Sequence, residues 1–284
     1  MLSAPGDGVK RTTPAMRRML RLAAFLVTLL GISMYVLAET TDRTAAWTIQ
    51  PLLTATFLGG AYFASLALEY LGSREREWAS ARIAVAGVVV FSFVMLGVTL
   101  LHLDRFHLGA ELDASPRFFG WIWLITYIAV PPVFAWVWWL QINAPGDDPP
   151  RQAPMPDRVR TALQLYGSAL MLAGIAMLAF PVAVGGAIWP WDLSPLTGRS
   201  TGAWLIGLGF VAAHMGREGD WLRGRGAAWG FVAFTLLQLA ALVRFPGIVS
   251  FADWRTWLYL VTVGGLGLAG SIAIQRGRRP AALQ

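Results

Sequence analysis

Apolar residues along the chain fall into eight long runs separated by short polar segments. The runs lie at about residues 21–38, 52–71, 82–103, 118–142, 161–183, 197–215, 227–244 and 256–275, and each is close to the ~20 residues that a helix needs to cross a bilayer. None has the alternating apolar and polar residues typical of outer-membrane barrel strands. Since lipid offers no partner for backbone hydrogen bonds, each run is predicted to form a transmembrane helix.

The sequence also repeats itself. Residues 53–100 match residues 196–243 without a gap, at a constant offset of 143 positions. The matching pairs include Glu77 with Asp220, Trp78 with Trp221, and Arg82 with Arg225. Four runs in each half mean that both halves enter the membrane in the same direction. The predicted fold class is therefore an all-α integral membrane protein, with eight transmembrane helices arranged as two parallel four-helix repeats.

A Pro-rich polar segment, residues 143–157, separates the two halves. Its prolines cannot continue a helix, so we interpret the segment as a cytoplasmic linker. The chain is then predicted to divide into a first four-helix repeat at residues 1–142, with a basic cytoplasmic N-terminus, the linker, and a second four-helix repeat at residues 158–284.

Basic residues are distributed unevenly between the two sides of the predicted membrane. Of the 23 lysines and arginines, seventeen lie on the side of the termini and the linker, and six on the other. Short loops rich in basic residues stay in the cytoplasm, so both termini are predicted to be cytoplasmic, in a bacterial inner membrane. Anionic lipid headgroups beside these loops explain the net charge of +7, and no nucleic-acid partner is expected.

The chain contains no cysteine, which excludes disulfides, thiolate metal sites and cysteine nucleophiles. The first run has an alternative interpretation as a secretory signal, since Val36-Leu37-Ala38 resembles a cleavage site. We favour a membrane helix, because the run is longer than a usual signal core. Its counterpart in the second half, near residues 161–183, is internal and cannot be a signal.

The most distinctive segment precedes the sixth run. It contains Trp189-Pro190-Trp191-Asp192, then Pro195-Leu196-Thr197, and then Arg199 and Gly202-Ala203-Trp204. Tryptophans at this depth are typical of the interfacial belt, and Thr197 is predicted to cap the following helix. In this segment the chain resembles a family of uncharacterised multi-pass bacterial membrane proteins that carry Trp-Pro-Trp, Pro-Leu-Thr and Gly-Ala-Trp motifs. The resemblance covers mainly this segment and implies no activity.

Ionisable residues on the outer side form a candidate ligand-binding site. The helices that follow Pro51 and Pro195 point free N-terminal amides outward, where arginines could help to hold an anionic headgroup or solute. Interfacial arginines also reach lipid phosphate without any dedicated site, and that alternative stays open. The candidate residues are His102, Asp104, Arg105, His107, Asp192, Arg199 and Arg244.

The segment from His102 to His107 permits a second interpretation, because imidazole and carboxylate groups can bind a metal or relay a proton. Residues five apart do not share a helix face, so both histidines could act together only if the helix ends between them. A structural ion pair in a helix-ending loop is the plainer alternative. No metal or cofactor is assigned, and His214 lies on the wrong side to share a haem with His102.

Two polar side chains lie within predicted spans. Gln238 is expected to bond to a neighbouring helix, and Glu69, near the cytoplasmic end of its span, is expected to reach the interface, although either could line a path.

Together these patterns favour a non-enzymatic membrane protein that handles a small solute or lipid, as a transporter or flippase with an outward-facing site between the halves. The alternatives are a membrane enzyme or metal- or haem-binding protein that uses His102 and His107, and an accessory subunit of a membrane complex. The expected partners are membrane lipids, with a homo-oligomer or a membrane-complex partner as further possibilities.

Overall fold

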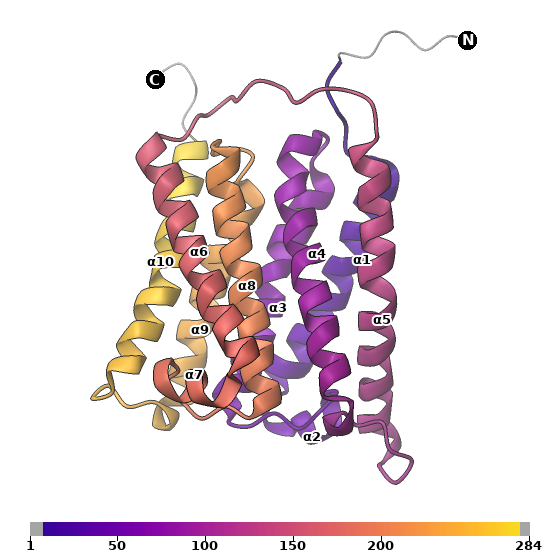
Figure 1. Ribbon diagram of the computed structural model, residues 1–284, viewed down its shortest axis with the longest axis vertical. Coiled ribbons are helices and arrows are strands. Elements are labelled where there is room, and N and C mark those ends of the chain that lie inside the picture. The colour runs from indigo at the N-terminus through magenta and orange to yellow at the C-terminus, as the bar shows by residue number, and fades with distance from the viewer. Residues whose placement is uncertain (1–7, 279–284) are drawn as a thin grey trace.

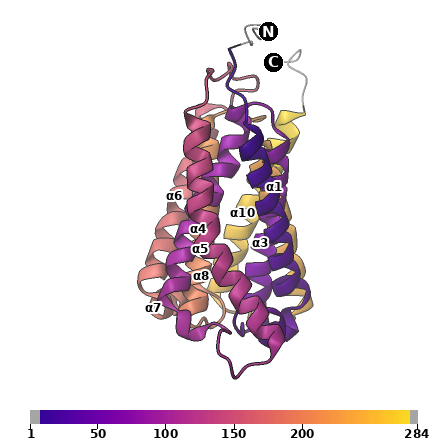
Figure 2. The same ribbon diagram turned by 90° about the vertical axis from the view of Figure 1, so that its right-hand side faces the viewer.

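The computed structural model describes residues 8–278, and within this range the chain is built from helices (Figure 1). Eight long helices of the described residues run side by side along the long axis of the molecule (Figure 1, Figure 2). They are α1 (Pro14–Gly31), α3 (Leu52–Arg74), α4 (Trp78–Leu101), α5 (Ala114–Ile142), α6 (Asp157–Ala179), α8 (Pro195–Glu218), α9 (Arg225–Arg244) and α10 (Trp254–Gly277).

Shorter elements close the end of the bundle that lies away from the start of α1. A π-helical turn (Ile32–Val36) extends α1, and α2 (Thr41–Thr44) follows it. The counterpart in the second half is α7 (Pro181–Ile188), which Pro181 separates from α6.

Seven helices of the described residues are long and apolar enough to cross a membrane, by length and composition: α1 with its π-helical extension, α3, α4, α5, α6, α9 and α10. They coincide with seven of the eight predicted runs. The fold is therefore that of an all-helical multi-pass membrane protein. The eighth predicted run coincides with α8, which is 24 residues long but less apolar.

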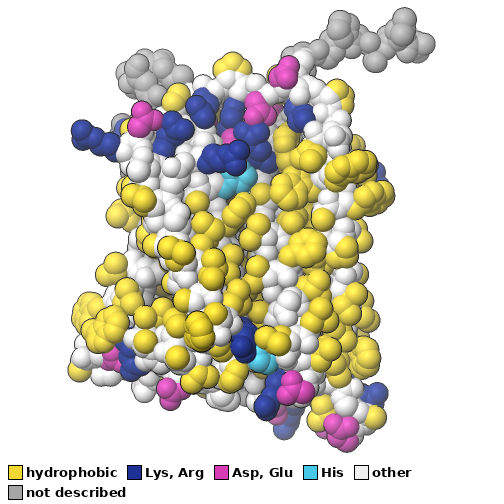
Figure 3. Space-filling model, in the orientation of Figure 1, with side chains coloured by type: hydrophobic (Ala, Val, Ile, Leu, Met, Phe, Trp, Pro, Cys, Tyr) yellow, Lys and Arg dark blue, Asp and Glu magenta, His cyan; other side chains and the backbone are white. Residues whose placement is uncertain are grey.

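The surface in view has an apolar band between two polar ends (Figure 3). Lysine and arginine side chains gather mainly at the end where α1 begins. The Pro-rich segment crosses this same end without forming a helix, and its Asp147 pairs with Val9 in an isolated bridge. The C-terminal end of α10 lies there too (Figure 1). We call this end of the bundle the linker end.

Close backbone contact joins α6 to α8. A Cβ atom added at Gly167 would lie 2.3 Å from the carbonyl oxygen of Gly209, and one added at Gly174 would lie 2.5 Å from that of Gly202. Small residues allow such contact between membrane helices. Between the halves, α4 packs against α8 and α9 packs against α3. Each half thus places its third long helix against the second long helix of the other half.

One local prediction, the capping residue of α8, is wrong. Ser194 caps α8 in place of Thr197, with its Oγ accepting a hydrogen bond from the Thr197 amide at 3.2 Å. The reason is that Pro195, which lacks an amide hydrogen, takes the first helical position and leaves the capping position to the residue before it. Trp189 and Trp191 are only 5% and 6% exposed and pack against each other, so their rings contact protein.

Candidate functional site

Two neighbouring cavities are both lined in part by α1 and α5. The first, about 320 Å³, is lined by the outer half of α1 and the first turns of α5, and we call it the α1–α5 cleft. The second, about 90 Å³, lies deeper, among α1, α3, α4, α5, α8 and α9, and we call it the inner chamber. Leu26, Leu30, Thr126 and Tyr127 line both cavities, so the cleft and the chamber are adjacent.

The cleft opens on the apolar side of the bundle. Three of its lining side chains, Ile32, Phe118 and Ile122, are also 41%, 60% and 40% exposed on the surface. These side chains lie on helices long and apolar enough to span a membrane, so the opening would face lipid rather than water.

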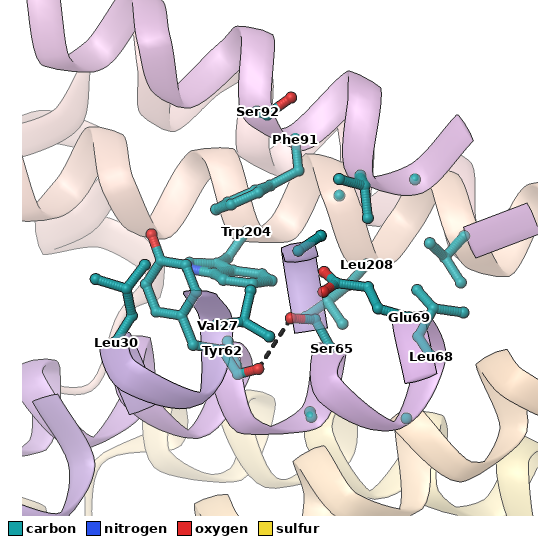
Figure 4. A pocket seen from close by; sticks show the side chains of 18 of the residues that line it. Val27, Leu30, Tyr62, Ser65, Leu68, Glu69, Phe91, Ser92, Trp204 and Leu208 are labelled. Carbon is teal, nitrogen blue, oxygen red and sulfur yellow. Dashed lines mark hydrogen bonds between the residues drawn. The ribbon is translucent and has the colours of Figure 1, made fainter. Parts of the chain in front are cut away.

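The polar groups of the inner chamber come mainly from one side of α3. Tyr62, Ser65 and Glu69 are spaced three and four residues apart, which places them on one helix face (Figure 4). The Ser65 hydroxyl donates a hydrogen bond to the carbonyl oxygen of Tyr62 at 2.9 Å. The hydroxyl oxygens of Tyr62 and Tyr127 are 2.6 Å apart, and this contact joins α3 to α5 on the chamber wall.

Glu69 supplies a carboxylate to this chamber. Its side chain is 2% exposed, and its Oε2 atom has no hydrogen-bond partner in the part of the chain that the structure describes. The described residues that line the chamber include no lysine, arginine or histidine. Burying an acid without a basic partner is costly, and such groups inside membrane helices mark functional sites more often than structural ones.

Sequence reasoning expected Glu69 to reach the interface. The structure instead turns its side chain into the chamber, because α3 is enclosed by neighbouring helices at this level. The signal that could have identified it is the polar stripe it forms with Tyr62 and Ser65 on an otherwise apolar helix.

Aromatic rings from three helices form a wall of the chamber. The Phe91 ring of α4 stacks on the Trp204 ring of α8, with centroids 3.9 Å apart. Tyr62 of α3 meets Trp204 edge-on, with centroids 4.8 Å apart (Figure 4). Because Trp204 belongs to α8, the second half of the chain contributes directly to this site.

Among the residues predicted to bind a ligand on the outer side, His102 and Arg199 meet. Arg199 donates from Nη1 to Nε2 of His102 at 3.0 Å and from Nε to the carbonyl oxygen of Leu178 at 3.0 Å. Since arginine can only donate, the His102 Nε2 must accept and the ring is neutral. Burial and the Arg199 charge lower the pKa of His102, which directly follows α4, and so favour that neutral form.

His107 makes protein contacts with both ring nitrogens. Its Nδ1 donates to the carbonyl oxygen of Ala45 at 3.0 Å, and the Thr48 hydroxyl lies 3.2 Å from its Nε2. The helix α4 ends at Leu101, directly before His102, so the two histidines do not lie on one helix. Within residues 8–278, however, no group of three histidine, cysteine, aspartate or glutamate side chains is placed to hold a metal ion.

The other predicted residues lie in separate contacts. Arg244 donates to the carbonyl oxygen of Tyr35 at 2.7 Å and to the Glu39 carboxylate at 3.2 Å, and so connects α9 to the end of the first long helix. Asp104 and Arg105 form an exposed ion pair at 2.9 Å. Asp192 is exposed in the loop before α8. The structure thus brings His102 and Arg199 together and distributes the remaining residues over several contacts.

A charged cluster that sequence reasoning did not identify lies at the linker end. Glu218, 4% exposed, accepts hydrogen bonds from Arg82 Nε at 2.5 Å and from Arg223 Nη1 at 3.2 Å. Arg82 also donates to Asp148 of the Pro-rich segment at 2.6 Å. We call these four residues the linker cluster. Burial alone would raise the pKa of Glu218, but hydrogen bonds from His214, Arg82 and Arg223 outweigh it and lower the pKa to about 2.

The fold and the chamber together describe a multi-pass membrane protein with an apolar pocket that contains a buried acid. No family model, curated protein or solved structure matches the chain. Fold alone does not determine function, so the functional argument has to come from the cleft and the chamber.

Proposed function

We propose that the protein is a transporter or flippase for an amphiphilic small molecule or lipid, which enters sideways from the bilayer through the α1–α5 cleft. The observation that carries this proposal is the adjacency of the cleft and the inner chamber, which share the lining residues Leu26, Leu30, Thr126 and Tyr127. An apolar wall with a few polar groups is typical of small-molecule sites. Here an apolar tail would lie in the cleft while a polar group reaches Glu69.

This proposal places the site deeper than the outer loops. The predicted outer residues already contact protein groups: Arg199 holds His102 and the end of α6, and Arg244 holds the end of the first long helix. Such contacts support a structural role on the outer side. The inner chamber, by contrast, offers an unpaired acceptor.

We further propose that α8 is an eighth span. It has the length of its neighbours, and 17 of its 24 residues are buried. A helix that faces protein on most sides can cross the membrane with glycine, serine and threonine in place of large apolar side chains, because few of them meet lipid. This explains why composition alone does not single it out.

The two-repeat arrangement is also part of the proposal. α4 packs on α8, and α9 packs on α3. These two equivalent contacts are expected if a twofold axis along the membrane normal relates the halves. A third cavity, about 210 Å³, lies between α6 and α10, the counterparts of α1 and α5. At the repeat offset of 143 positions, Ala212 takes the place of Glu69, so only the first half supplies the acid.

We place the protein in a bacterial cytoplasmic membrane with the linker end inside, which the basic side chains at that end support (Figure 3). Because the chain has no cysteine, single cysteines report topology directly. A cysteine at Gln152 in the linker should be reached only from the cytoplasm, and one at Ala252 between α9 and α10 only from outside. Labelling of both from the same side would contradict the topology.

Blocking the cleft tests the proposed function. In Thr126→Trp a large ring would fill the passage between cleft and chamber, whereas Ile125→Trp adds a similar ring at a neighbouring side chain that is 60% exposed and lines neither cavity. The proteins are placed in vesicles of phosphatidylethanolamine and phosphatidylglycerol with a fluorescent lipid, and movement of the probe between leaflets is followed by dithionite quenching. Native mass spectrometry in lipid nanodiscs reports bound molecules in parallel.

We expect Thr126→Trp to lose bound amphiphile and probe movement, while Ile125→Trp and the unaltered protein keep both. Equal retention and equal movement in all three proteins would refute access through the cleft. Metal in the purified protein, or haem absorption, would instead favour the His102 and His107 alternative. A larger complex after gentle solubilisation would favour an accessory subunit.

A further inference from the structure

We propose that the inner chamber binds the protonated amine of a single-chain amphiphile, with Glu69 as its counter-ion. This inference depends on the proposed function above, because it names the substrate class of the same site.

The first argument is charge. The Glu69 carboxylate is buried, its Oε2 atom has no hydrogen-bond partner among residues 8–278, and no basic side chain of those residues lines the chamber. The guanidinium of Arg223 lines a different small cavity, nearer the linker end. An ammonium group provides both the positive charge and the N–H donors that this oxygen lacks, in a charge-assisted hydrogen bond.

The second argument is the aromatic wall. Phe91, Trp204 and Tyr62 lie around the chamber on three different helices. Aromatic rings bring no positive charge to the chamber, and rings near a cation can attract it through their negative faces. A phosphate headgroup would find no basic side chain among the described residues that line the chamber.

The third argument is shape. The chamber, about 90 Å³, is much smaller than the cleft, about 320 Å³. A small head such as an ammonium group fits the chamber, and an unbranched alkyl chain can extend from it past Leu30 and Thr126 into the cleft. The small volumes of the two cavities favour one chain over the two chains of a bilayer phospholipid.

A matched pair of ligands tests the inference. Decylamine and decan-1-ol have the same chain and differ in the charge of the head at neutral pH. Binding of each is measured by native mass spectrometry and by tryptophan fluorescence, on the full-length protein in phosphatidylcholine nanodiscs. The variants are Glu69→Gln, which keeps the side-chain shape and removes its charge, and Glu111→Gln, which does the same at an exposed carboxylate. Thr126→Trp is included as the cleft variant.

We expect the unaltered protein and Glu111→Gln to bind decylamine at least about tenfold more tightly than decan-1-ol, and Glu69→Gln to lose that preference. Equal affinity of the unaltered protein for the two ligands would overturn the inference without any variant. So would unchanged amine preference in Glu69→Gln.

The outcomes separate the two proposals. If Thr126→Trp abolishes binding of both ligands while Glu69→Gln keeps the amine preference, the cleft remains the substrate path and the amine assignment fails. If Thr126→Trp leaves binding of both ligands unchanged, the proposal that ligands enter through the cleft fails. Glu69→Gln should fold about as stably as the parent, because glutamine keeps the shape of the side chain and no basic side chain of the described residues that line the chamber loses a partner.

Discussion

The linker cluster gives a quantitative prediction for Glu218→Gln. Glu218 ends α8, and its carboxylate lies between Arg82 of α4 and Arg223, both bonded to it. Glutamine has nearly the same shape but no charge, so the substitution leaves both guanidinium groups without their shared counter-ion. Because α4 and α8 belong to different halves, the lost interaction is one that holds the halves together.

Two routes lead to a similar magnitude. Removing one partner of a buried ion pair typically costs about 3–5 kcal/mol of unfolding free energy. The pKa of Glu218, about 2 against an ordinary 4.5, corresponds to about 3 kcal/mol, which solvent contact at the rim of the cluster reduces. We therefore expect Glu218→Gln to lower the free energy of unfolding by about 2–3 kcal/mol at neutral pH.

The same carboxylate sets a pH dependence. Its pKa is lower in the folded protein than in the unfolded chain, so its contribution is complete above pH 4.5 and is lost as the pH falls toward about 2. The unaltered protein should lose stability across this interval, and Glu218→Gln should lack that part of the loss. Equilibrium unfolding in mild detergent, followed by tryptophan fluorescence at several pH values, measures both effects.

An exposed ion pair on α6 is the control. Asp157 and Arg160 are 2.8 Å apart, but the Asp157 side chain is 90% exposed, so Asp157→Asn should cost less than about 1 kcal/mol. If Glu218→Gln is no more destabilising than Asp157→Asn, the cluster does not hold the halves together and the reasoning fails.

Two further substitutions test helix packing. Gly209→Ala should lower the free energy of unfolding by about 1–3 kcal/mol, because its Cβ would lie 2.5 Å from the Gly167 carbonyl oxygen. Gly97→Ala is the control and should be neutral, because a Cβ at Gly97 would lie in open space. Equal effects of the two substitutions in equilibrium unfolding would contradict the close α6–α8 contact. Trp191→Phe should lower the free energy of unfolding by about 1–2 kcal/mol, because it removes the 2.9 Å hydrogen bond from Nε1 to buried Thr54. Adding Thr54→Val, which removes the acceptor left without a partner, should recover part of that loss in the same assay. A double variant no more stable than the single would show that the bond does not matter.

The positions of the helices could be predicted from sequence because hydropathy reflects contact with lipid. For the same reason composition is least informative for α8, whose residues Thr201 and Ser200 are fully buried against protein. The internal repeat indicated that segment independently of its composition. Internal similarity is independent of which side chains meet lipid.

The candidate site could be predicted only in part. Both His102 and Arg199 were expected on the outer side, yet their contact joins residues 97 positions apart, which no local pattern indicates. Glu69 was visible as an acid within a span, but its direction depends on which helices enclose α3. Trp191 illustrates the same limit, since an interfacial tryptophan and a buried one that donates to Thr54 have the same local sequence.

The packing of α9 on α3 has a consequence for biogenesis. While the ribosome is still making the second half, α3 has been inserted but the helix that covers one of its sides has not yet been translated. The structure therefore implies that the bundle is completed late in synthesis, and that until α9 arrives the exposed side of α3 must be covered by lipid or by an insertion chaperone.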